Sequence, residues 1–453
     1  MPAAPDKRKS QRSPLLVAVL FVAFVLALGL LVGGKAIHLR DGSGVDASPY
    51  QRDETFTEVE RAVRGGGALA GDGDTVYANP GDDLRELARG LHPGDTLLLR
   101  GGTYATDLNL SNLRGRSDAW ITIAAAPGEE AVLDGGSMRP SVMVSVSTCS
   151  YLRISGLAIR NASGRDSCGI SVSPGSNHVV LDRNRISDIS VSATPQEGDC
   201  ANGILLFGDS AREAISEVYL YGNELRDCET GWSECISISG HVRGVDVEAN
   251  RIDNISNIGI DFAGNYGYCP DPALDFPVDC SATNNVVSNC RSEFATSYGL
   301  YMDGGQRIRL EGNQVRSCSG GIEIGAEKVP SKEGYSTGDI QVRNNTIEGC
   351  DEAGMSIGGY SRELGWVQNV TVEGNNCRNN GGEDGAILAL SKCRYVTLRG
   401  NVLQNQAGRA EIVSSEMGPD QTKDISFDGN SYGNGLPADG TRFSFCGQVL
   451  HGL

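Results

Sequence analysis

One short phrase recurs along this chain: apolar residues alternate over three positions, and an asparagine follows three places after the last of them. VYLYGNEL, VDVEANRI and IRLEGNQV are examples. The asparagine occupies a fixed place in each phrase, at Asn184, Asn223, Asn250, Asn285, Asn313, Asn345, Asn375, Asn401 and Asn430. Its intervals run from 26 to 39 residues. A repeat of this length is typical of solenoids, in which each coil buries its apolar face against its neighbours.

The alternation within each phrase predicts a strand with one buried face. A second set of short apolar strands lies between the asparagines, beginning at residues 169, 203, 235, 259, 299, 321, 354 and 386. Amphipathic helices find no room between these strands, which argues against helical and leucine-rich solenoids. We therefore predict an all-β fold, a right-handed parallel β-helix. Asparagine tolerates the left-handed backbone of tight turns, and stacked amides can bond along a column, so we expect an asparagine ladder.

Cysteines recur five residues after the ladder position, at Cys228, Cys290, Cys318 and Cys350. The alternation places this column inside the coil, so we expect stacked core residues first and disulfides second. The 13 cysteines fit an oxidising compartment, and their odd number leaves at least one unpaired. Two pairs are close enough in sequence to close small loops, Cys228 with Cys235 and Cys269 with Cys280.

The chain divides into five predicted segments. Residues 1–13 form a basic cytoplasmic tail, 14–34 an uncharged transmembrane signal-anchor, 35–75 a flexible linker, 76–446 the β-helix and 447–453 a C-terminal tail. A short amphipathic helix over residues 82–91 is expected to cap the first coil. The positive-inside rule predicts an extracytoplasmic solenoid, membrane-anchored, or secreted if the apolar segment is cleaved.

Composition limits the partners. The chain has 57 acidic and 39 basic residues, a net charge of −18, and no basic cluster beyond its first dozen positions. Nucleic acid is therefore not an expected partner. Zinc-type CxxC pairs are absent from the sequence, which argues against metal-thiolate chemistry. We expect a monomer.

Acidic residues gather on the outward positions of the second strand set. Reading across coils gives one file of Ser237, Asp261, Tyr301, Glu323 and Ser356, and a second of Ser239, Ala263, Asp303, Gly325 and Gly358. A third file holds His241, Asn265, Gly305 and Glu327. Because neighbouring strands are about 4.8 Å apart, we predict one acidic patch beside Tyr301.

Three interpretations of this patch stay open. Two carboxyl groups could act as general acid and base on a glycosidic bond. Alternatively Asp261, Asp303 and Glu323 could bind Ca²⁺ and neutralise a uronate while Lys328 or Tyr301 removes its C5 proton. The third is that exposed carboxylates only keep a long sheet soluble. The insert between Cys269 and Cys280 could contact substrate, bind Ca²⁺, or be a solvated loop closed by a disulfide.

The strings PGDTLLLRGGTY and ITIAAAPGEEAVLDGG, together with the repeats, resemble the pectate-lyase-like right-handed parallel β-helix superfamily, which includes chondroitinase B and alginate lyases. A tighter resemblance, from about residue 258 to 360, rests on GIDFAGNYG, SYGLYMDGGQRIRLEGNQV, GGIEIGAEK and GMSIGGY. These strings are similar to secreted bacterial β-helix proteins of mostly unassigned activity. The catalytic motifs of mannuronan epimerases, polygalacturonases and chondroitinase B do not map onto this sequence.

The sequence thus predicts a protein that binds an acidic polysaccharide along its sheet and cleaves it by lyase or hydrolase chemistry. The predicted catalytic residues are Asp261, Tyr301, Asp303, Glu323, Glu327 and Lys328. Ca²⁺ is the one cofactor considered. The alternative is a non-catalytic cell-surface adhesion or glycan-binding protein that uses the same sheet.

Overall fold

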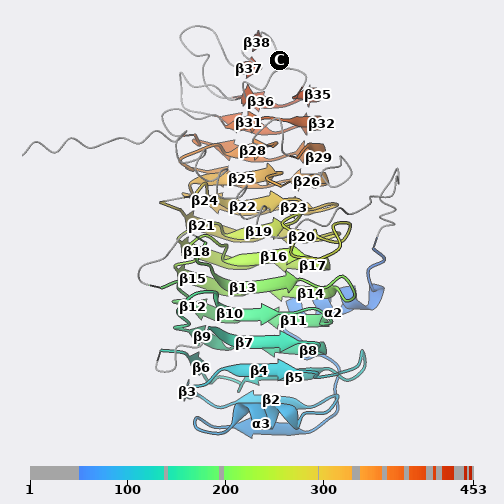
Figure 1. The fold of residues 1–453 in the computed structure, drawn as a ribbon, viewed down its shortest axis with the longest axis vertical. Helices are drawn as coiled ribbons and strands as arrows, with labels where there is room; N and C mark the ends of the chain where they lie inside the picture. Colours follow the sequence, from blue (N-terminus) through green and yellow to red (C-terminus); the bar gives the residue numbers. More distant parts are fainter. Residues whose placement is uncertain are drawn as a thin grey trace, which may run out of the picture. The chain divides into compact units, whose positions relative to one another are not determined.

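The structure is a computed structural model that describes residues 50–136, 141–192, 198–293, 295–328, 337–359, 365–381, 387–404, 412–414, 421–432, 443–445 and 448–450. Its strands form three long sheets, called A, B and C here, of 13, 12 and 13 strands. Successive coils stack along one axis and contribute strands to the three sheets in turn (Figure 1). The predicted parallel β-helix is confirmed.

Sheet A consists of β1 (Thr75–Ala78), β2 (Thr96–Leu99), β5 (Ile121–Ala125), β8 (Ser150–Ser155), β11 (Asn177–Asp182), β14 (Ile215–Tyr221), β17 (Val242–Glu248), β20 (Ser281–Thr283), β23 (Arg309–Glu311), β26 (Thr337–Arg343), β29 (Val367–Glu373), β32 (Cys393–Arg399) and β35 (Lys423–Asp428). Sheet B consists of β3 (Gly102–Tyr104), β6 (Ala131–Asp134), β9 (Ala158–Arg160), β12 (Arg185–Ser187), β15 (Glu224–Cys228), β18 (Arg251–Ile255), β21 (Val286–Cys290), β24 (Gln314–Arg316), β27 (Thr346–Glu348), β30 (Asn376–Arg378), β33 (Val402–Gln404) and β36 (Ser431–Tyr432).

Sheet C consists of β4 (Leu108–Ser111), β7 (Val142–Ser147), β10 (Ser167–Val172), β13 (Ala201–Gly208), β16 (Ile236–Gly240), β19 (Ile260–Ala263), β22 (Tyr298–Asp303), β25 (Gly320–Gly325), β28 (Met355–Ile357), β31 (Leu388–Leu390), β34 (Ile412–Ser414), β37 (Phe443–Phe445) and β38 (Gln448–Leu450). The last strand, β38, runs antiparallel to β37. It falls within the segment predicted as a C-terminal tail.

The core is a column of aliphatic side chains inside the coil. In sheet A, the inward residues Leu181, Leu220 and Val247 pair across β11, β14 and β17 and are fully buried. Each stacks on the same position one coil away, about 4.8 Å along the axis. The repeated apolar alternation therefore sets both the strand face and its register.

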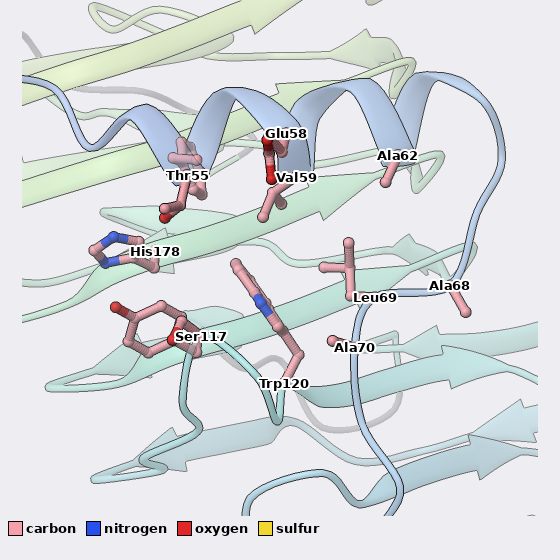
Figure 2. Close-up of a pocket in the computed structure, with 12 residues that line it drawn as sticks. Thr55, Glu58, Val59, Ala62, Ala68, Leu69, Ala70, Ser117, Trp120 and His178 are labelled. Carbon is pink, nitrogen blue, oxygen red and sulfur yellow. The ribbon is translucent and has the colours of Figure 1, made fainter.

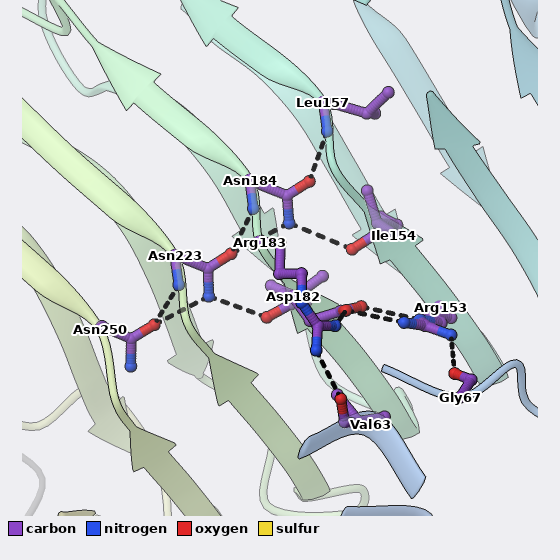
Figure 3. Close-up of polar contacts among 11 residues, drawn as sticks. Val63, Gly67, Arg153, Ile154, Leu157, Asp182, Arg183, Asn184, Asn223 and Asn250 are labelled. Carbon is purple, nitrogen blue, oxygen red and sulfur yellow. Dashed lines mark hydrogen bonds and ion pairs between the residues drawn. The ribbon is translucent and has the colours of Figure 1, made fainter. Parts of the chain in front are cut away.

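The ladder asparagines bond as the sequence predicts. Asn223 Oδ1 accepts from the backbone N–H of Asn184 at 3.0 Å and from its Nδ2 at 3.1 Å, while Asn223 Nδ2 donates to Leu181 O at 2.8 Å (Figure 3). Asn250 repeats the pattern one coil on. Each amide thus satisfies backbone groups that the bend between sheets A and B would leave without partners.

The left-handed backbone, however, lies one residue before each ladder asparagine. Positive φ angles occur at Arg183, Gly222, Ala249, Asn284, Gly312, Asn344, Gly374, Gly400 and Gly429. The expectation that the ladder residue itself adopts this conformation is wrong. Asparagine is needed there for its amide, and the preceding residue makes the turn, which explains why five of those nine positions are glycine.

Two helices accompany the solenoid. Helix α3 (Leu84–Arg89) begins after Asp83, whose side chain caps Arg85 N and Glu86 N, and packs on β1 and β4 at the first coil (Figure 1). The predicted capping helix is present, two residues shorter at each end. Because its Leu84 and Ala88 are buried, it covers core that the first coil would expose.

Helix α2 (Glu54–Arg64) forms within the segment predicted as a flexible linker, residues 35–75. Its Phe56 and Val63 are buried in a small cluster with Trp120, Val180 and Tyr219 on the outer face of sheet A. Helix α2 and the segment that follows it also accept hydrogen bonds through two backbone carbonyls. Arg183 donates to Val63 O at 2.7 Å, and Arg153 donates to Gly67 O at 2.9 Å (Figure 3). The sequence did not predict α2, because its two buried apolar residues, Phe56 and Val63, do not belong to the repeat.

Buried charged residues also hold α2 against sheet A. Arg52, just before the helix, forms ion pairs with Glu60 of the helix and with Glu217 and Asp246 of sheet A. Burial and the charge of Asp246 raise the pKa of Glu60 to about 8. The segment is therefore fastened to sheet A by both packing and charge.

The predicted membrane segment, residues 14–34, lies outside the described residues. Neither α2 nor α3 has the length and apolar character that a bilayer-crossing helix requires.

The cysteine column is confirmed as core. Cys228, Ile255 and Cys290 pair in register across sheet B, and both thiols are buried. The twelve cysteines of the described residues are all free, so the expected Cys228–Cys235 and Cys269–Cys280 disulfides are not formed. The Cys228 and Cys280 thiols instead donate to backbone carbonyls at 3.3 Å, as small buried groups do.

Candidate active site

The first predicted file of sheet C is confirmed. Strand register pairs Ser237 with Asp261, Asp261 with Tyr301, Tyr301 with Glu323, and Glu323 with Ser356. Because their neighbours along each strand fill the core, these five side chains start on the outer face.

These side chains are nevertheless covered. Asp261 is 3% exposed, Glu323 2% and Asp303 1%, whereas Glu327 and Lys328 are half-buried. A carboxylate that keeps a sheet soluble must face water, so the structure rules out the solubilising interpretation for the three buried carboxyl groups. Burying several carboxyl groups together is costly and needs another reason.

The second and third files are only partly formed. Asp303 pairs with Gly325 and Ser239 with Ala263, but Ala263 bonds to Gly304 rather than to Asp303. His241 turns away, because its ring bonds to Ser210 O at 2.7 Å. From the third file, Glu327 is the residue that hydrogen bonds tie to the acidic patch.

Hydrogen bonds join Asp303, Glu327, Tyr301 and Tyr266 into one network, which with Asp261 we call the acidic centre. Glu327 N donates to Asp303 Oδ1 at 2.7 Å, and Tyr301 donates to Glu327 Oε1 at 2.7 Å. The Tyr266 hydroxyl contacts both Asp303 Oδ2 and, at 3.0 Å, Glu327 Oε2. A phenol has one proton and cannot donate fully to both. The arrangement is satisfied when Asp303 carries a proton and donates to Tyr266, which donates to Glu327.

The electrostatics agree with this proton placement. Burial, followed by the charge of Glu327, raises the pKa of Asp303 to about 8. Burial, followed by the charges of Glu234, Asp303 and Glu327, raises the pKa of Asp261 well above its usual range. The buried Oδ1 of Asp261 has no hydrogen-bond partner among the described residues. The acidic centre therefore favours the protonated forms of Asp303 and Asp261.

Glu323 and Lys328 flank the acidic centre. The charge of Glu323 adds to burial in raising the pKa of Tyr298, whose ring stacks on Tyr301 with centroids 6.3 Å apart. The Lys328 ammonium lies 5.2 Å from the centre of the Tyr266 ring. The six predicted site residues are thus brought into one region, with Asp303, Glu327 and Tyr301 in direct contact.

Two members of the region were not predicted as catalytic. Tyr266, which lies between β19 and the insert, was not among the predicted site residues, yet its hydroxyl contacts two carboxyl groups. Glu234, which accepts from Ser233 at 3.1 Å, is a principal charge acting on Asp261. Its position two residues before β16, the strand that pairs with β19, was the available signal.

Binding of Ca²⁺ by Asp261, Asp303 and Glu323 stays a prediction. Groups of three or more His, Cys, Asp or Glu with metal-binding geometry are absent from the described residues. Both oxygens of Asp303 are already engaged in hydrogen bonds, Oδ1 with Glu327 N and Oδ2 with the Tyr266 hydroxyl. In the insert, Asp275 accepts from Gly267 N and Cys269 N, and Asp279 pairs with Arg307. These aspartates hold the loop in place.

A hollow lies beneath α2, away from these residues. It has a volume of about 240 Å³ and is lined by Trp120, Tyr151 and His178 together with the helix and the segment that follows it (Figure 2). His178 bonds to Asp53 at 3.0 Å and to Asn177 at 2.9 Å. The residues that line this hollow include one carboxyl group, Glu58, and no pair of them. We therefore interpret the hollow as a gap in the packing between α2 and sheet A.

Known proteins share this architecture. The family model described as "Right handed beta helix region" matches residues 142–334. The Bacillus subtilis (strain 168) protein YwoF, described as uncharacterized, is 27% identical over 363 residues, covering 74% of this chain and 75% of its own length.

Solved structures show the same fold at low identity. A lacto-N-biosidase of family GH136 from Eubacterium ramulus has a TM-score of 0.55 and 14% identity, covering 83% of this chain and 69% of its own. The surface adhesin PfbA of Streptococcus pneumoniae has a TM-score of 0.54 and 14% identity, covering 78% and 86%. A family 28 exopolygalacturonase of Yersinia enterocolitica has a TM-score of 0.54 and 14% identity, covering 82% and 77%.

The repeats, the three stacked parallel sheets and these likenesses agree with one another. The chain therefore has the right-handed parallel β-helix fold, and its residues 142–334 match the right-handed β-helix family model.

Proposed function

We propose that this protein binds a polysaccharide across the outer face of sheet C and hydrolyses a glycosidic bond at the acidic centre. The observation that carries the proposal is the hydrogen-bonded set of carboxyl groups, in which buried Asp303 and half-buried Glu327 share the Tyr266 phenol, and burial raises the pKa values of Asp303 and Asp261. Glycoside hydrolysis needs this pair of states, one carboxylic acid and one carboxylate.

Each group has a distinct role in this proposal. Asp261, whose Oδ1 lacks a hydrogen-bond partner among the described residues, donates its proton to the leaving oxygen. Glu327, held by the two phenols Tyr266 and Tyr301, takes a proton from the attacking water. Asp303 fixes the Glu327 backbone and limits the local negative charge.

Lyase chemistry fits the centre less well. Removing a C5 proton requires a base, and both Tyr266 and Tyr301 donate their own protons to carboxylates. The neighbouring Asp303 and Glu327, together with burial, also raise the pKa of Tyr266 well above that of a free phenol. A phenol held neutral in this way is a poor base.

The fold itself serves several functions, since proteins with it include a lacto-N-biosidase, an exopolygalacturonase and a surface adhesin. We further propose an extracytoplasmic location, because polysaccharide is the ligand and residues 14–34 are predicted to anchor the chain in a membrane.

The test is incubation with a panel of neutral and uronic-acid glycans, with reducing ends and absorbance at 232 nm as readouts. Hydrolysis gives new reducing ends without that absorbance, and Asp261→Asn and Glu327→Gln should each lose at least about 100-fold in rate. Glu348→Gln, at an exposed carboxylate on sheet B, is the matched control and should retain full rate. Absorbance at 232 nm would show a lyase instead. Binding without cleavage would show an adhesin-like protein and refute the hydrolase.

A further inference from the structure

The charged groups between helix α2 and sheet A contain more carboxyl groups than cations. The carboxyl groups belong to Glu60, Glu217, Asp246 and Glu248, and the guanidinium groups to Arg52 and Arg64. We call these six residues the α2 charge cluster. With every group ionised, four carboxylates against two guanidinium groups would leave two negative charges without a partner. Because Glu60, Glu217 and Asp246 are buried, this state is unfavourable.

Glu60 is the carboxyl group of this cluster that is best placed to carry a proton. Glu217 accepts a bond from the Tyr50 hydroxyl at 2.8 Å, and Asp246 accepts one from the Ser281 hydroxyl. Hydrogen bonds from neutral donors stabilise these two groups as carboxylates. In the part of the chain that the structure describes, Glu60 contacts guanidinium groups and receives no bond from a neutral donor. Burial, followed by the charge of Asp246, raises the pKa of Glu60 to about 8.

The net charge beneath α2 depends on few other groups. The ionisable groups packed around Glu60 are the other members of the cluster and the two phenols bonded to them, Tyr50 and Tyr219. Charged groups nearer the ends of α2 are paired elsewhere, Asp53 with His178 and Arg183 with Asp182. Gain or loss of the proton on Glu60 therefore changes the charge of the interface directly.

Packing alone holds α2 incompletely. Phe56 and Val63 are buried against sheet A, but the hollow of about 240 Å³ lies along the helix beside Val59 and Ala62 (Figure 2). Three successive glycines at 65–67 follow the helix and leave its last turn free to pivot. The α2 charge cluster therefore contributes much of the attachment.

We propose that α2 is a pH-sensitive switch, which lies on sheet A while Glu60 carries a proton and detaches when that proton is lost to solvent. In the closed state the Glu60 carboxyl group donates its proton to Asp246 across the interface. Loss of the proton leaves two carboxylates facing each other there, and their repulsion lifts the helix. Detachment uncovers the aromatic side chains of Trp120 and Tyr219, which α2 covers in the closed state. This inference concerns sheet A and does not rest on the proposed function.

Trypsin cleavage of the full chain after Arg61 and Arg64, identified by mass spectrometry, measures detachment. Both arginines are exposed on α2, but a protease cannot cleave the helix while it lies folded on the sheet. Rates are divided by the rate of the same trypsin on an unstructured peptide. Between pH 7 and pH 9 the corrected rate should rise about tenfold, because a group with a pKa of about 8 in the closed state changes the detachment constant by that factor.

Two variants of α2 carry the comparison. Glu60→Gln keeps an uncharged donor toward Asp246, so its corrected rate should match the parent at pH 7 and change by less than about twofold up to pH 9. Glu54→Gln removes an exposed carboxyl group of the same helix and should keep the tenfold rise of the parent.

A third variant separates detachment of α2 from unfolding of the whole solenoid. Asp303 has its own pH dependence, so Asp303→Asn should keep the tenfold rise at Arg61 and Arg64 if detachment is local. A rise that is absent from the parent, equal in Glu60→Gln or lost in Asp303→Asn refutes the switch. Faster cleavage of Glu60→Gln than of the parent at pH 7 also refutes it, because the closed state would then need a charged Glu60.

Discussion

Removing one rung of the asparagine ladder should destabilise the solenoid far more than removing the neighbouring asparagine. Asn375 is fully buried, and its Oδ1 accepts from the backbone N–H and the Nδ2 of Asn345, both at 2.9 Å. Its Nδ2 donates to Val342 O at 2.8 Å and to Asn401 Oδ1 at 2.9 Å.

The magnitude follows from which partners are left behind in Asn375→Ala. Asn345 Nδ2 keeps its bond to Leu310 O at 3.0 Å, and Asn401 Oδ1 keeps the backbone N–H of residue 375 at 2.9 Å. The Asn345 N–H and the Val342 carbonyl lose their asparagine partner inside the bend. At roughly 1–3 kcal/mol for each buried polar group, Asn375→Ala should lower the free energy of unfolding by about 2–6 kcal/mol.

Asn376→Ala is the matched control. Asn376 is the next residue, is only half-buried, and its side-chain oxygen accepts one bond from Arg378 at 2.7 Å. This substitution should change stability by no more than about 0.5 kcal/mol. Urea unfolding followed by far-ultraviolet circular dichroism measures both variants. If Asn375→Ala and Asn376→Ala unfold at the same urea concentration, the ladder does not hold adjacent coils together and the reasoning fails.

Two further substitutions test the backbone turn and the acidic centre. Ala249 is exposed and has a φ of 56°, at a position where several other coils have glycine. Ala249→Gly should therefore raise the free energy of unfolding by about 0.5–1 kcal/mol in the same urea assay. An unchanged or lowered free energy of unfolding would contradict backbone strain at Ala249. The pKa of Asp303 in the folded protein is raised to about 8. Between about pH 4 and pH 8 the folded protein therefore keeps a proton on Asp303 that the unfolded chain releases, so the free energy of unfolding falls as the pH rises through this range. Asp303→Asn should remove that part of the pH dependence, at most on the order of 5 kcal/mol, and identical pH profiles for the two proteins would show that Asp303 is not held protonated.

Much of the architecture could be predicted because its cause is local and repeated. Alternating apolar residues specify each strand, and the recurring asparagine specifies each bend, so the file from Asp261 through Tyr301 to Glu323 was placed correctly from spacing alone. Helix α2 was missed for the opposite reason. It occurs once, and its two buried residues, Phe56 and Val63, gain their meaning only from Trp120 and Tyr219 on sheet A.

The acidic centre, likewise, was predicted only in part. Register brought Asp261, Tyr301 and Glu323 together, but the prediction treated them as exposed because strand alternation says which face a side chain starts on and nothing about what covers it. Tyr266 lies outside the repeat, between β19 and the insert, and its contacts with Asp303 and Glu327 depend on the path of that segment. Non-repeating segments therefore determine the burial, and through burial the protonation state, of residues that the repeat positions.

This dependence links stability and activity in a definite way. Protonated Asp303 satisfies the Tyr266 phenol and leaves Glu327 as the carboxylate that receives its proton. Raising the pH removes the proton on Asp303, brings two negative charges onto one phenol and destabilises the fold beside Asp261, the proposed acid. If the hydrolase proposal is correct, activity and stability should decline over the same pH range. The Asp303→Asn variant should lose this shared decline, which separates an electrostatic cause at Asp303 from general alkaline unfolding.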